Sequence, residues 1–467
     1  MSAAKSPILD RISAAILLLL AGLELTHLVL GQEWANLPAR IAACALLIVV
    51  IPKFGLREWS LLLIALALTA GLWLQPGGGE HVAFALSRGA YFTAFILLMM
   101  LLREAAATSD SVLKVGDWTT RQPPAKRYVA VWFSGHIAGI LLNFGAVSLL
   151  APLVQRGVRA RPINTPEEEA RMLIRERRQI SALTRGFAMV ITWAPTTLTQ
   201  VIIFASLPGL DVGKVFVLAM GLAATMLALG WTEDRLRWGK PKLALELPDG
   251  FPGRALVDLI FVYAMLIVGA FGVQYLAGCT LPQALMSVAP MMLVGWVVSQ
   301  SQRGVIASAP ARLAEIFHVS IPNMARNAFQ LGSAGYIGIC AAKLAPVALI
   351  ADWTQAAHIP DWALVAMLPV LITIGGTVAL SPMVMVVFLA AVVSALPQMP
   401  ADLEYIAIAL GFGWALSITA APNATAALLV AGATGIPSTT LTWKWNGVYS
   451  LCAMVVFAGL CRVMIGG

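Results

Sequence analysis

The chain has 467 residues, of which 59% are hydrophobic and only 12% are charged, with a mean hydropathy of +0.83. A soluble domain carries about twice that charged fraction, so the composition excludes a soluble globular protein. The net charge of +8 comes from Lys and Arg in short loops between apolar blocks. That placement is the positive-inside pattern of membrane proteins, and we expect no nucleic-acid partner.

Apolar blocks of about 20 residues are long enough to cross a hydrocarbon core of about 30 Å. The first block contains Glu24 and His27 and lacks a clear small-residue cleavage site, so we interpret it as an uncleaved helix and not as a signal peptide. The sequence predicts eleven membrane-spanning segments, at 12–31, 36–53, 58–75, 82–102, 182–206, 213–231, 255–276, 281–300, 328–350, 403–431 and 439–463.

The apolar stretch 128–155 is predicted to be a re-entrant hairpin. Clusters of Lys and Arg flank it in 103–127 and 156–178, and both clusters favour the cytoplasmic side. A single crossing would leave one cluster outside. Two limbs of about 13 residues would each be about 20 Å long. We expect the bend near Asn143 and Gly145, because Asn and Gly suit a turn.

The capping box of Thr165 and Glu168, with Pro166 between them, predicts the start of a short cytoplasmic helix over 165–180. This helix is expected to lie along the membrane surface. A solvated, charged loop is the alternative interpretation of the same segment.

The apolar stretch 362–397 has flanks of the opposite kind. Residues 351–361 and 398–404 contain four acidic residues and no Lys or Arg, so both ends are compatible with the outside. Gly375-Gly376 and Ser381-Pro382 lie in the middle. The pattern predicts a second hairpin, which enters the membrane from the opposite face.

Two segments of the chain repeat each other. Residues 186–195 read Gly-Phe-Ala-Met-Val-Ile-Thr-Trp-Ala-Pro and residues 413–422 read Gly-Trp-Ala-Leu-Ser-Ile-Thr-Ala-Ala-Pro, with six of ten positions identical. Each copy follows one of the predicted hairpins, and the hairpins enter from opposite faces, so we expect an inverted repeat. Pro-interrupted segments at matching places in two halves indicate the binding site of a transporter.

The predicted fold is therefore an all-α polytopic membrane protein with about 11 transmembrane helices and two re-entrant hairpins in an inverted repeat. Its parts are an extra N-terminal helix in 1–35, a first repeat in 36–231 with a broken helix at 182–206, a cytoplasmic linker in 232–254, and a second repeat in 255–467 with a broken helix at 403–431.

Pro195 and Pro422 would break these two helices, because each removes an amide and blocks a helical carbonyl bond. In lipid this is costly unless the freed groups line a protein cavity or bind an ion. The N-termini of half-helices can then offer amides to an anion, and exposed carbonyls can hold Na⁺. The simpler interpretation is a pair of proline kinks with a packing role only.

This order of helices, hairpin, broken helix and helix, repeated after one extra helix, resembles the ion transporter superfamily, which includes divalent anion/sodium symporters and arsenite-pump-like permeases. In the symporters each hairpin tip carries Ser-Asn-Thr, which helps to bind Na⁺ and a substrate carboxylate. Here the tips read Leu142-Asn143-Phe144-Gly145 and Leu380-Ser381-Pro382-Met383, so Asn143 and Ser381 carry over. The resemblance also implies a homodimer and an elevator-like movement of one domain.

Ionisable residues inside apolar blocks are functional candidates, because a charge is costly there. Arg88 would attract an anion, although it can equally pair with a carboxylate or reach an interface. His136, in the first limb of the first hairpin, would couple transport to protons, and a hydrogen-bonded structural histidine is the alternative. The chain contains no H-E-x-x-H, G-x-S-x-G or phosphate-loop motif, so no enzyme is predicted.

The sequence thus predicts a secondary transporter of a small anion, such as an organic carboxylate, coupled to Na⁺ or H⁺ by alternating access. We expect it in the cell inner membrane, with the N-terminus cytoplasmic and the C-terminus external, and with no cofactor except Na⁺. The alternatives are efflux of an inorganic oxyanion or metalloid such as arsenite, and a membrane-embedded enzyme or scaffold. The predicted binding residues are Asn143, Gly145, Thr196, Thr197, Ser381, Asn423 and Thr425.

Overall fold

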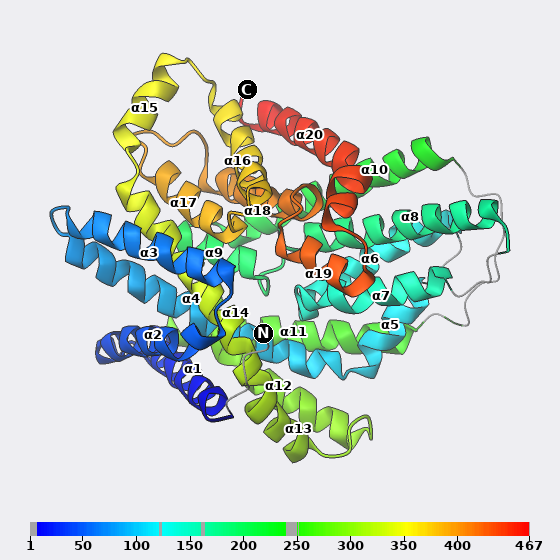
Figure 1. The fold of residues 1–467 in the computed structure, drawn as a ribbon, viewed down its shortest axis with the longest axis horizontal. Helices are drawn as coiled ribbons and strands as arrows, with labels where there is room; N and C mark the ends of the chain where they lie inside the picture. The colour runs from blue at the N-terminus through cyan, green and yellow to red at the C-terminus, as the bar shows by residue number, and fades with distance from the viewer. Residues whose placement is uncertain (1–6, 121–123, 160–163, 240–249, 251, 467) are drawn as a thin grey trace. The chain divides into compact units, whose positions relative to one another are not determined.

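The computed structural model describes residues 7–120, 124–159, 164–239, 250 and 252–466, and every regular element in that part of the chain is a helix (Figure 1). The all-α class is therefore confirmed for the described residues. Seven of the described helices, or up to eight if a bent pair is one span, are long and apolar enough to cross a membrane. The number of eleven spanning helices stays a prediction.

The chain divides into two compact units. Unit 1 comprises Met1–Ser109 and Ile260–Pro346, and unit 2 comprises Asp110–Leu259 and Val347–Gly467. The first predicted repeat contributes one stretch of chain to each unit, and the second contributes 260–346 to unit 1 and 255–259 with 347–467 to unit 2. The inverted relation between the repeats stays a prediction.

Unit 1 is organised around α4 (Gly78–Ala107), whose C-terminal half is largely buried and packs on α14 (Ile321–Leu344) and α12 (Leu281–Gln302). A Cβ at Gly332 would lie 1.9 Å from Thr93 Oγ1, so only glycine allows α14 to approach α4 this closely. The other elements of unit 1 are α1 (Pro7–Leu28), η1 (Glu33–Ala35), α2 (Asn36–Val50), η2 (Ile51–Lys53), α3 (Leu56–Trp73), α13 (Ala309–Glu315) and η3 (Ile316–Ser320).

Unit 2 contains both helical hairpins and both broken helices. The first hairpin is α6 (Pro124–Leu142) with α7 (Gly145–Arg159), and the second is α16 (Asp361–Thr377) with α17 (Pro382–Ser394). The broken helices are α8 (Pro166–Val190) with α9 (Leu198–Ser206), and α18 (Leu403–Ala420) with α19 (Thr425–Thr434). The other elements are α5 (Asp110–Thr120), α10 (Val212–Trp238), α15 (Val347–Ala356), the π-helix η4 (Thr440–Asn446) and α20 (Gly447–Ile465), while α11 (Gly253–Ala277) begins in unit 2 and ends in unit 1.

The hairpins and broken helices pack in a matched pattern. Helix α6 lies along α8, and α16 lies along α18, so the first limb of each hairpin supports the broken helix that follows it. The second limbs cross over, because α7 packs on α19 and α17 packs on α9. Each hairpin therefore contacts the broken helices of both halves.

The first hairpin is longer than predicted. Its first limb, α6, begins at Pro124 and has 19 residues, about 28 Å at 1.5 Å per residue, and its second limb ends at Arg159. The predicted length of about 13 residues is wrong for this limb, because Lys126 and Arg127 continue the helix and do not merely flank it. Basic residues mark where a segment leaves the membrane and not where its helix begins.

The segment 165–180 is helical, which excludes the charged-loop interpretation, but a separate surface helix is also wrong. Thr165 caps the helix as predicted, with its hydroxyl accepting a hydrogen bond from the Glu168 amide at 3.2 Å. The helix then continues to Val190 as the first half of the broken helix. No Pro or Gly occurs between Pro166 and Gly186, so nothing in the sequence ends the helix earlier.

The predicted span 328–350 is also interrupted. Helix α14 ends at Leu344 and α15 starts at Val347, because Pro346 cannot donate the next helical hydrogen bond. Part of the predicted linker 232–254 is helix, since α10 extends to Trp238, and residues 240–249 and 251 lie outside the described part of the chain.

Candidate functional site

The first hairpin bends at a residue with a left-handed backbone. Helix α6 ends at Leu142, α7 begins at Gly145, and Asn143 between them has a φ of +50°. Asn accepts this conformation more readily than most residues. The Asn143 carbonyl accepts from the amide of Ala146 at 2.9 Å, which closes the turn. The bend lies at the predicted residues.

The second hairpin bends after a Schellman ending of α16. The amide of Leu380 donates to Gly375 at 2.9 Å, and the amide of Ala379 donates to Gly376 at 3.3 Å. Ala379 holds the left-handed position, with φ +69°, where glycine is usual. Ser381 follows as the N-cap of α17, and its hydroxyl makes no capping hydrogen bond. This bend also lies within the segment that the sequence indicated.

The two helix breaks occur at the predicted prolines. Pro195 lies between α8 and α9, and Pro422 lies between α18 and α19. In each copy of the repeat, the Thr three residues before Pro bonds back to its own helix. Thr192 donates to the Met189 carbonyl at 2.7 Å, and Thr419 donates to the Leu416 carbonyl at 3.0 Å.

One residue after each proline, a polar side chain joins the break to the adjacent hairpin. The Thr196 hydroxyl donates to the Ile140 carbonyl at 2.9 Å, near the end of α6. The Asn423 amide donates to the Thr377 carbonyl at 2.9 Å, at the end of α16. Thr196 and Asn423 hold the same position in the two copies of the repeat. The same contact is thus made twice, with different side chains.

The first residue of each repeat copy is a glycine for steric reasons. A Cβ at Gly186 would lie 1.9 Å from the Trp132 carbonyl oxygen on α6. A Cβ at Gly413 would lie 2.8 Å from Pro369 Cα on α16. Any larger residue would force the broken helix away from its hairpin, and the hydrogen bonds at the breaks depend on that close approach.

The predicted binding residues form two groups within unit 2. The first group is buried: Thr196 and Thr197 are 6% and 1% exposed, and the Oδ1 atom of Asn143 is buried without a hydrogen-bond partner among the described residues. The second group is open, because Asn423 and Thr425 are exposed. Gly145, the first residue of α7, is buried beside Asn143 in the first group, and half-buried Ser381 belongs to the second.

The His136 ring is fixed by two hydrogen bonds and by stacking on two tryptophans. Its Nε2 atom accepts from the indole N–H of Trp193 at 2.8 Å, so Nδ1 carries the proton and donates to the Gly186 carbonyl at 3.0 Å. The ring also stacks on Trp132 and Trp193, with centroid distances of 4.5 and 5.5 Å. A neutral imidazole satisfies both contacts, which favours the structural interpretation of this histidine.

Arg88 belongs to unit 1, whereas the other predicted site residues belong to unit 2. Its guanidinium lies over the ring of Phe84, 5.2 Å from the centroid. Buried Glu24, on α1 of the same unit, is within electrostatic range of it. Pairing with a carboxylate was the alternative interpretation of this arginine. Among the described residues, no group of three His, Cys, Asp or Glu side chains could hold a metal ion.

Gln200 is a further candidate that the sequence patterns did not indicate. This side chain is 1% exposed on α9, and its amide donates to the carbonyls of Ile191 and Thr192, at 3.2 and 2.5 Å. These are carbonyls that the end of α8 leaves without helical partners. The signal was an amide side chain at the end of the polar run Thr196-Thr197-Leu198-Thr199 that follows Pro195, just before an apolar run.

Arg185 was also missed, although it precedes the first repeat copy inside an apolar block. Its side chain is 2% exposed and donates to Asn446 at 2.8 Å, to Glu233 at 2.9 Å and to Tyr128 at 3.3 Å. The guanidinium also lies 4.1 Å from the ring centroid of Tyr449. A buried arginine with this many partners ties α6, α8, α10 and α20 together.

These helices, hairpins and helix breaks define a polytopic α-helical membrane protein. No family model matches the chain, and no curated protein matches its sequence. Sixteen solved chains match it in structure. Among them is the crystal structure of the YdaH transporter of Alcanivorax borkumensis, described as having an unusual topology, with a TM-score of 0.59 and 17% sequence identity over 88% of this chain and 98% of that one. At this identity the likeness concerns the fold.

Proposed function

We propose that the chain is a secondary active transporter that binds a small anion at the hairpin bends and helix breaks of unit 2. The observation that carries the proposal is the pair of hydrogen bonds from Thr196 to Ile140 and from Asn423 to Thr377. They join each broken helix to a hairpin at matching positions of the repeat. A solved chain with this fold is itself a transporter, which supports the assignment.

The second group of site residues is the better candidate for substrate contact. Asn423 donates one amide hydrogen to the Thr377 carbonyl, so the second hydrogen on Nδ2 can donate to a ligand. The hydroxyls of Ser381 and Thr425 make no hydrogen bond to another described residue. Both stand at the N-terminal ends of helices of ten or more residues, α17 and α19, whose free amides favour an anion. An organic carboxylate fits this set of donors.

Coupling to Na⁺ or H⁺ and alternating access by an elevator-like movement complete the proposal. We also propose a homodimer in the inner membrane, with the N-terminus cytoplasmic and the C-terminus external. His136 is a poor proton carrier in this arrangement, because protonation of Nε2 would break its hydrogen bond from Trp193. Na⁺ is therefore the ion to test first.

Transport is tested in proteoliposomes with labelled small carboxylates, under a Na⁺ gradient or a pH gradient. We expect Asn143→Ala with Asn423→Ala, and separately Thr425→Val, to reduce uptake at least tenfold. The matched control is Thr225→Val, because that hydroxyl is exposed on α10 and bonds only to its own helix, at Gly221. Unchanged uptake in the double variant would refute the site, and the lack of any gradient-driven flux would refute transport of these anions.

A further inference from the structure

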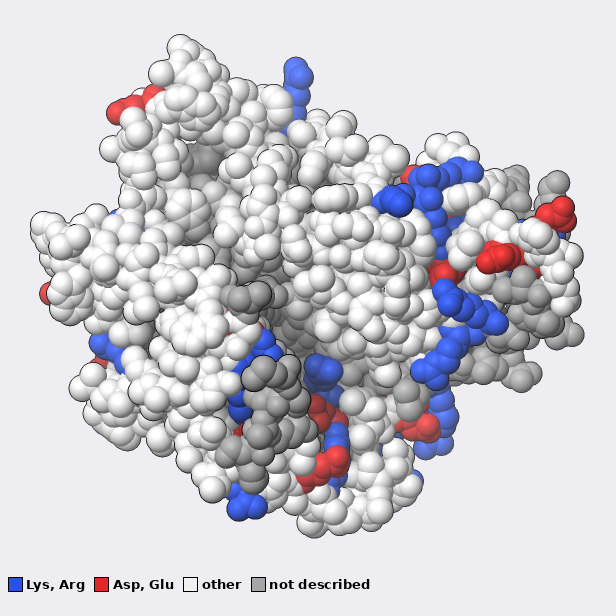
Figure 2. All heavy atoms as spheres, in the orientation of Figure 1, with Lys and Arg blue, Asp and Glu red and all other residues white. Residues whose placement is uncertain are grey.

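A cluster of cations lies where α8, α10 and η4 meet in unit 2. The guanidinium carbons of Arg177 and Arg237 each lie 5.5 Å from the ring centroid of Trp238. Arg177 also donates to the carbonyls of Lys444 and Trp445, at 2.9 and 3.3 Å, which fixes η4 beside α8. The side chain of Lys444 is exposed at the same place. Figure 2 shows Lys and Arg atoms gathered over this end of α8 and α10.

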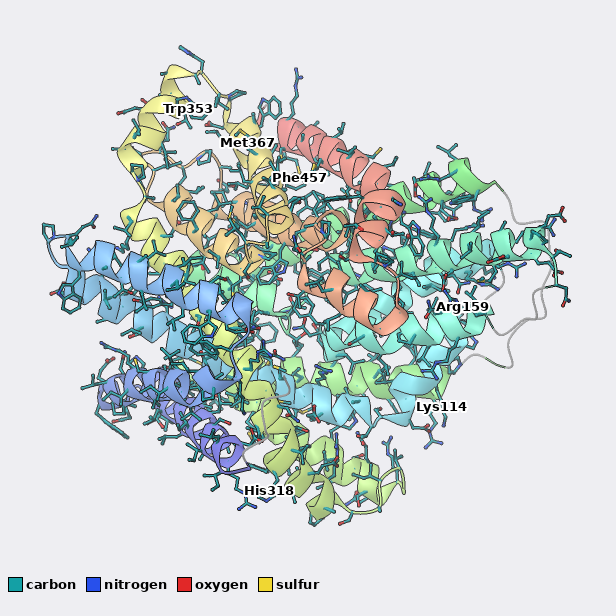
Figure 3. The ribbon with its side chains drawn as sticks, viewed as in Figure 1. Lys114, Arg159, His318, Trp353, Met367 and Phe457 are labelled. Atoms are coloured by element: carbon teal, nitrogen blue, oxygen red, sulfur yellow. The ribbon has the colours of Figure 1, made fainter. Side chains whose placement is uncertain are left out.

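The acidic residues nearby are already paired. Glu233 binds buried Arg185 at 2.9 Å and shares its other oxygen with Arg237 at 3.5 Å. Asp234 is bound by Arg178 at 2.7 Å. Glu176, which immediately precedes Arg177 in α8, is bound by Arg159 at 2.9 Å, and Figure 3 labels Arg159 near the end of α7.

The cluster therefore has more positive charge than its carboxylates balance. Glu233 is the ion-pair partner of both Arg185 and Arg237, and it acts on Arg177 only electrostatically. Lys444 has no acidic partner among the described residues. Burial lowers the pKa of Arg177, and the adjacent guanidinium of Arg237 lowers it further. Both effects disfavour the charged guanidinium, which a bound anion would stabilise.

The surroundings of the cluster have the composition of a membrane interface. Trp231, Leu236 and Trp443 are 41%, 83% and 56% exposed. Trp at the level of the lipid headgroups, together with Arg and Lys, is the usual pattern there. Helix α20 follows η4 directly in the chain and exposes apolar side chains at Val448, Leu451 and Val455. Acyl chains of a lipid could pack against these side chains, which continue along α20 from the cluster.

We propose that Arg177, Arg237 and Lys444 bind the headgroup phosphate of an anionic phospholipid, with its acyl chains along the exposed face of α20. The basic segments 156–178 and 232–254 predict that this end of the protein faces the cytoplasm. Anionic lipids give the cytoplasmic leaflet its negative surface potential, so the expected ligand is present there. The proposal is independent of the transport function.

The test uses the full-length protein in nanodiscs of phosphatidylcholine, with increasing fractions of phosphatidylglycerol. Lipid binding is read as the rise in melting temperature and as phosphatidylglycerol retained in native mass spectrometry. Each basic residue near the surface contributes about fivefold to anionic-lipid affinity, so Arg177→Gln with Arg237→Gln and Lys444→Gln should lose on the order of 100-fold. The matched control changes three arginines elsewhere on the same side, Arg156, Arg171 and Arg175, to Gln and removes the same charge.

Arg177 also holds η4 through its hydrogen bonds to two backbone carbonyls, so the triple variant could be unstable. A second variant, with only Arg237→Gln and Lys444→Gln, keeps these bonds and tests the same site. We expect it to lose on the order of 25-fold in affinity. An equal loss in the matched control would overturn the proposal, since it would indicate general electrostatics. Equal stabilisation by inorganic phosphate without the lipid would overturn it as well, because the ligand would then be a free anion. Retention of phosphatidylglycerol by the triple variant would exclude these residues.

Discussion

Replacement of Gln200 by Met tests whether the first helix break is closed by the protein's own side chain. Met keeps the length and volume of Gln but cannot donate a hydrogen bond. The carbonyls of Ile191 and Thr192 would lose the Gln200 amide in a position that is 1% exposed. Thr192 would then have no side-chain donor among the described residues, whereas Ile191 keeps a weak contact with the Thr197 hydroxyl at 3.5 Å.

The magnitude follows from the two lost bonds. A buried acceptor that is left unpaired costs about 1–3 kcal/mol, although polar contacts inside membrane proteins average only about 0.6 kcal/mol. The variant also removes the Oε1 atom of Gln200, which is buried without a partner among the described residues, and this offsets part of the loss. We expect Gln200→Met to lower the free energy of unfolding by about 2 kcal/mol.

Equilibrium unfolding in mixed micelles measures this difference. Gln200→Glu should lose at least as much, because an ionised carboxylate presents acceptors to two carbonyl oxygens. The matched control is Gln274→Met, on α11, whose side chain bonds to no other described residue. If Gln200→Met stays within about 0.5 kcal/mol of the parent protein, as surface substitutions do, the argument about freed carbonyls is wrong.

Three further substitutions test other parts of unit 2. Gly186→Ala should lower the yield of folded protein and the free energy of unfolding, by about 1–3 kcal/mol, because its Cβ would overlap the Trp132 carbonyl. Gly432→Ala has open space around it and should be neutral or stabilising in the same gel-filtration and melting assays. Arg185→Met should cost about 3–5 kcal/mol, because Glu233 keeps only its longer ion pair with Arg237, and Asn446 and Tyr128 lose their donor. Adding Glu233→Gln should recover part of this loss in unfolding titrations, and no recovery would contradict the pairing. Ala379→Gly should raise stability by up to about 1 kcal/mol, since φ +69° strains alanine, and a lower melting temperature would argue against that strain.

The sequence was sufficient to predict the helical class, both bends and both breaks. Each of these depends on local chemistry: Pro195 and Pro422 cannot continue a helix, and Asn143 accepts a left-handed turn. Limb lengths were less predictable, because the same rules do not say how far a helix extends past the membrane. Helix α8 shows this most clearly, because it runs from Pro166 to Val190 without a break, where the sequence predicted a short helix followed by a separate span.

The contacts of the site could not be derived from local rules. Nothing in the sequence says that Thr196 reaches Ile140, or that Gln200 turns back to cap α8. Both contacts depend on how α6, α8 and α9 pack. Arg185 was visible as a charge inside an apolar block, but its partners come from α6, α10 and η4, which are distant in sequence. Such long-range pairing is set by tertiary packing and not by periodicity.

The two helix breaks differ in how their backbone carbonyls are bonded, although the repeat motif is similar in both. The position that matches Gln200 in the second copy is Ala427, which is 3% exposed and clusters with Ala421 and Ala424. No described side chain donates to the carbonyls of Ile418 and Thr419, whereas the matching carbonyls of Ile191 and Thr192 accept from Gln200. The carbonyls of the first break are therefore already bonded by the protein. At the second break, near exposed Asn423, the carbonyls of Ile418 and Thr419 have no side-chain donor among the described residues. A substrate or ion that needs open backbone groups has a reason to prefer the second break, although the two copies of the motif look alike in sequence.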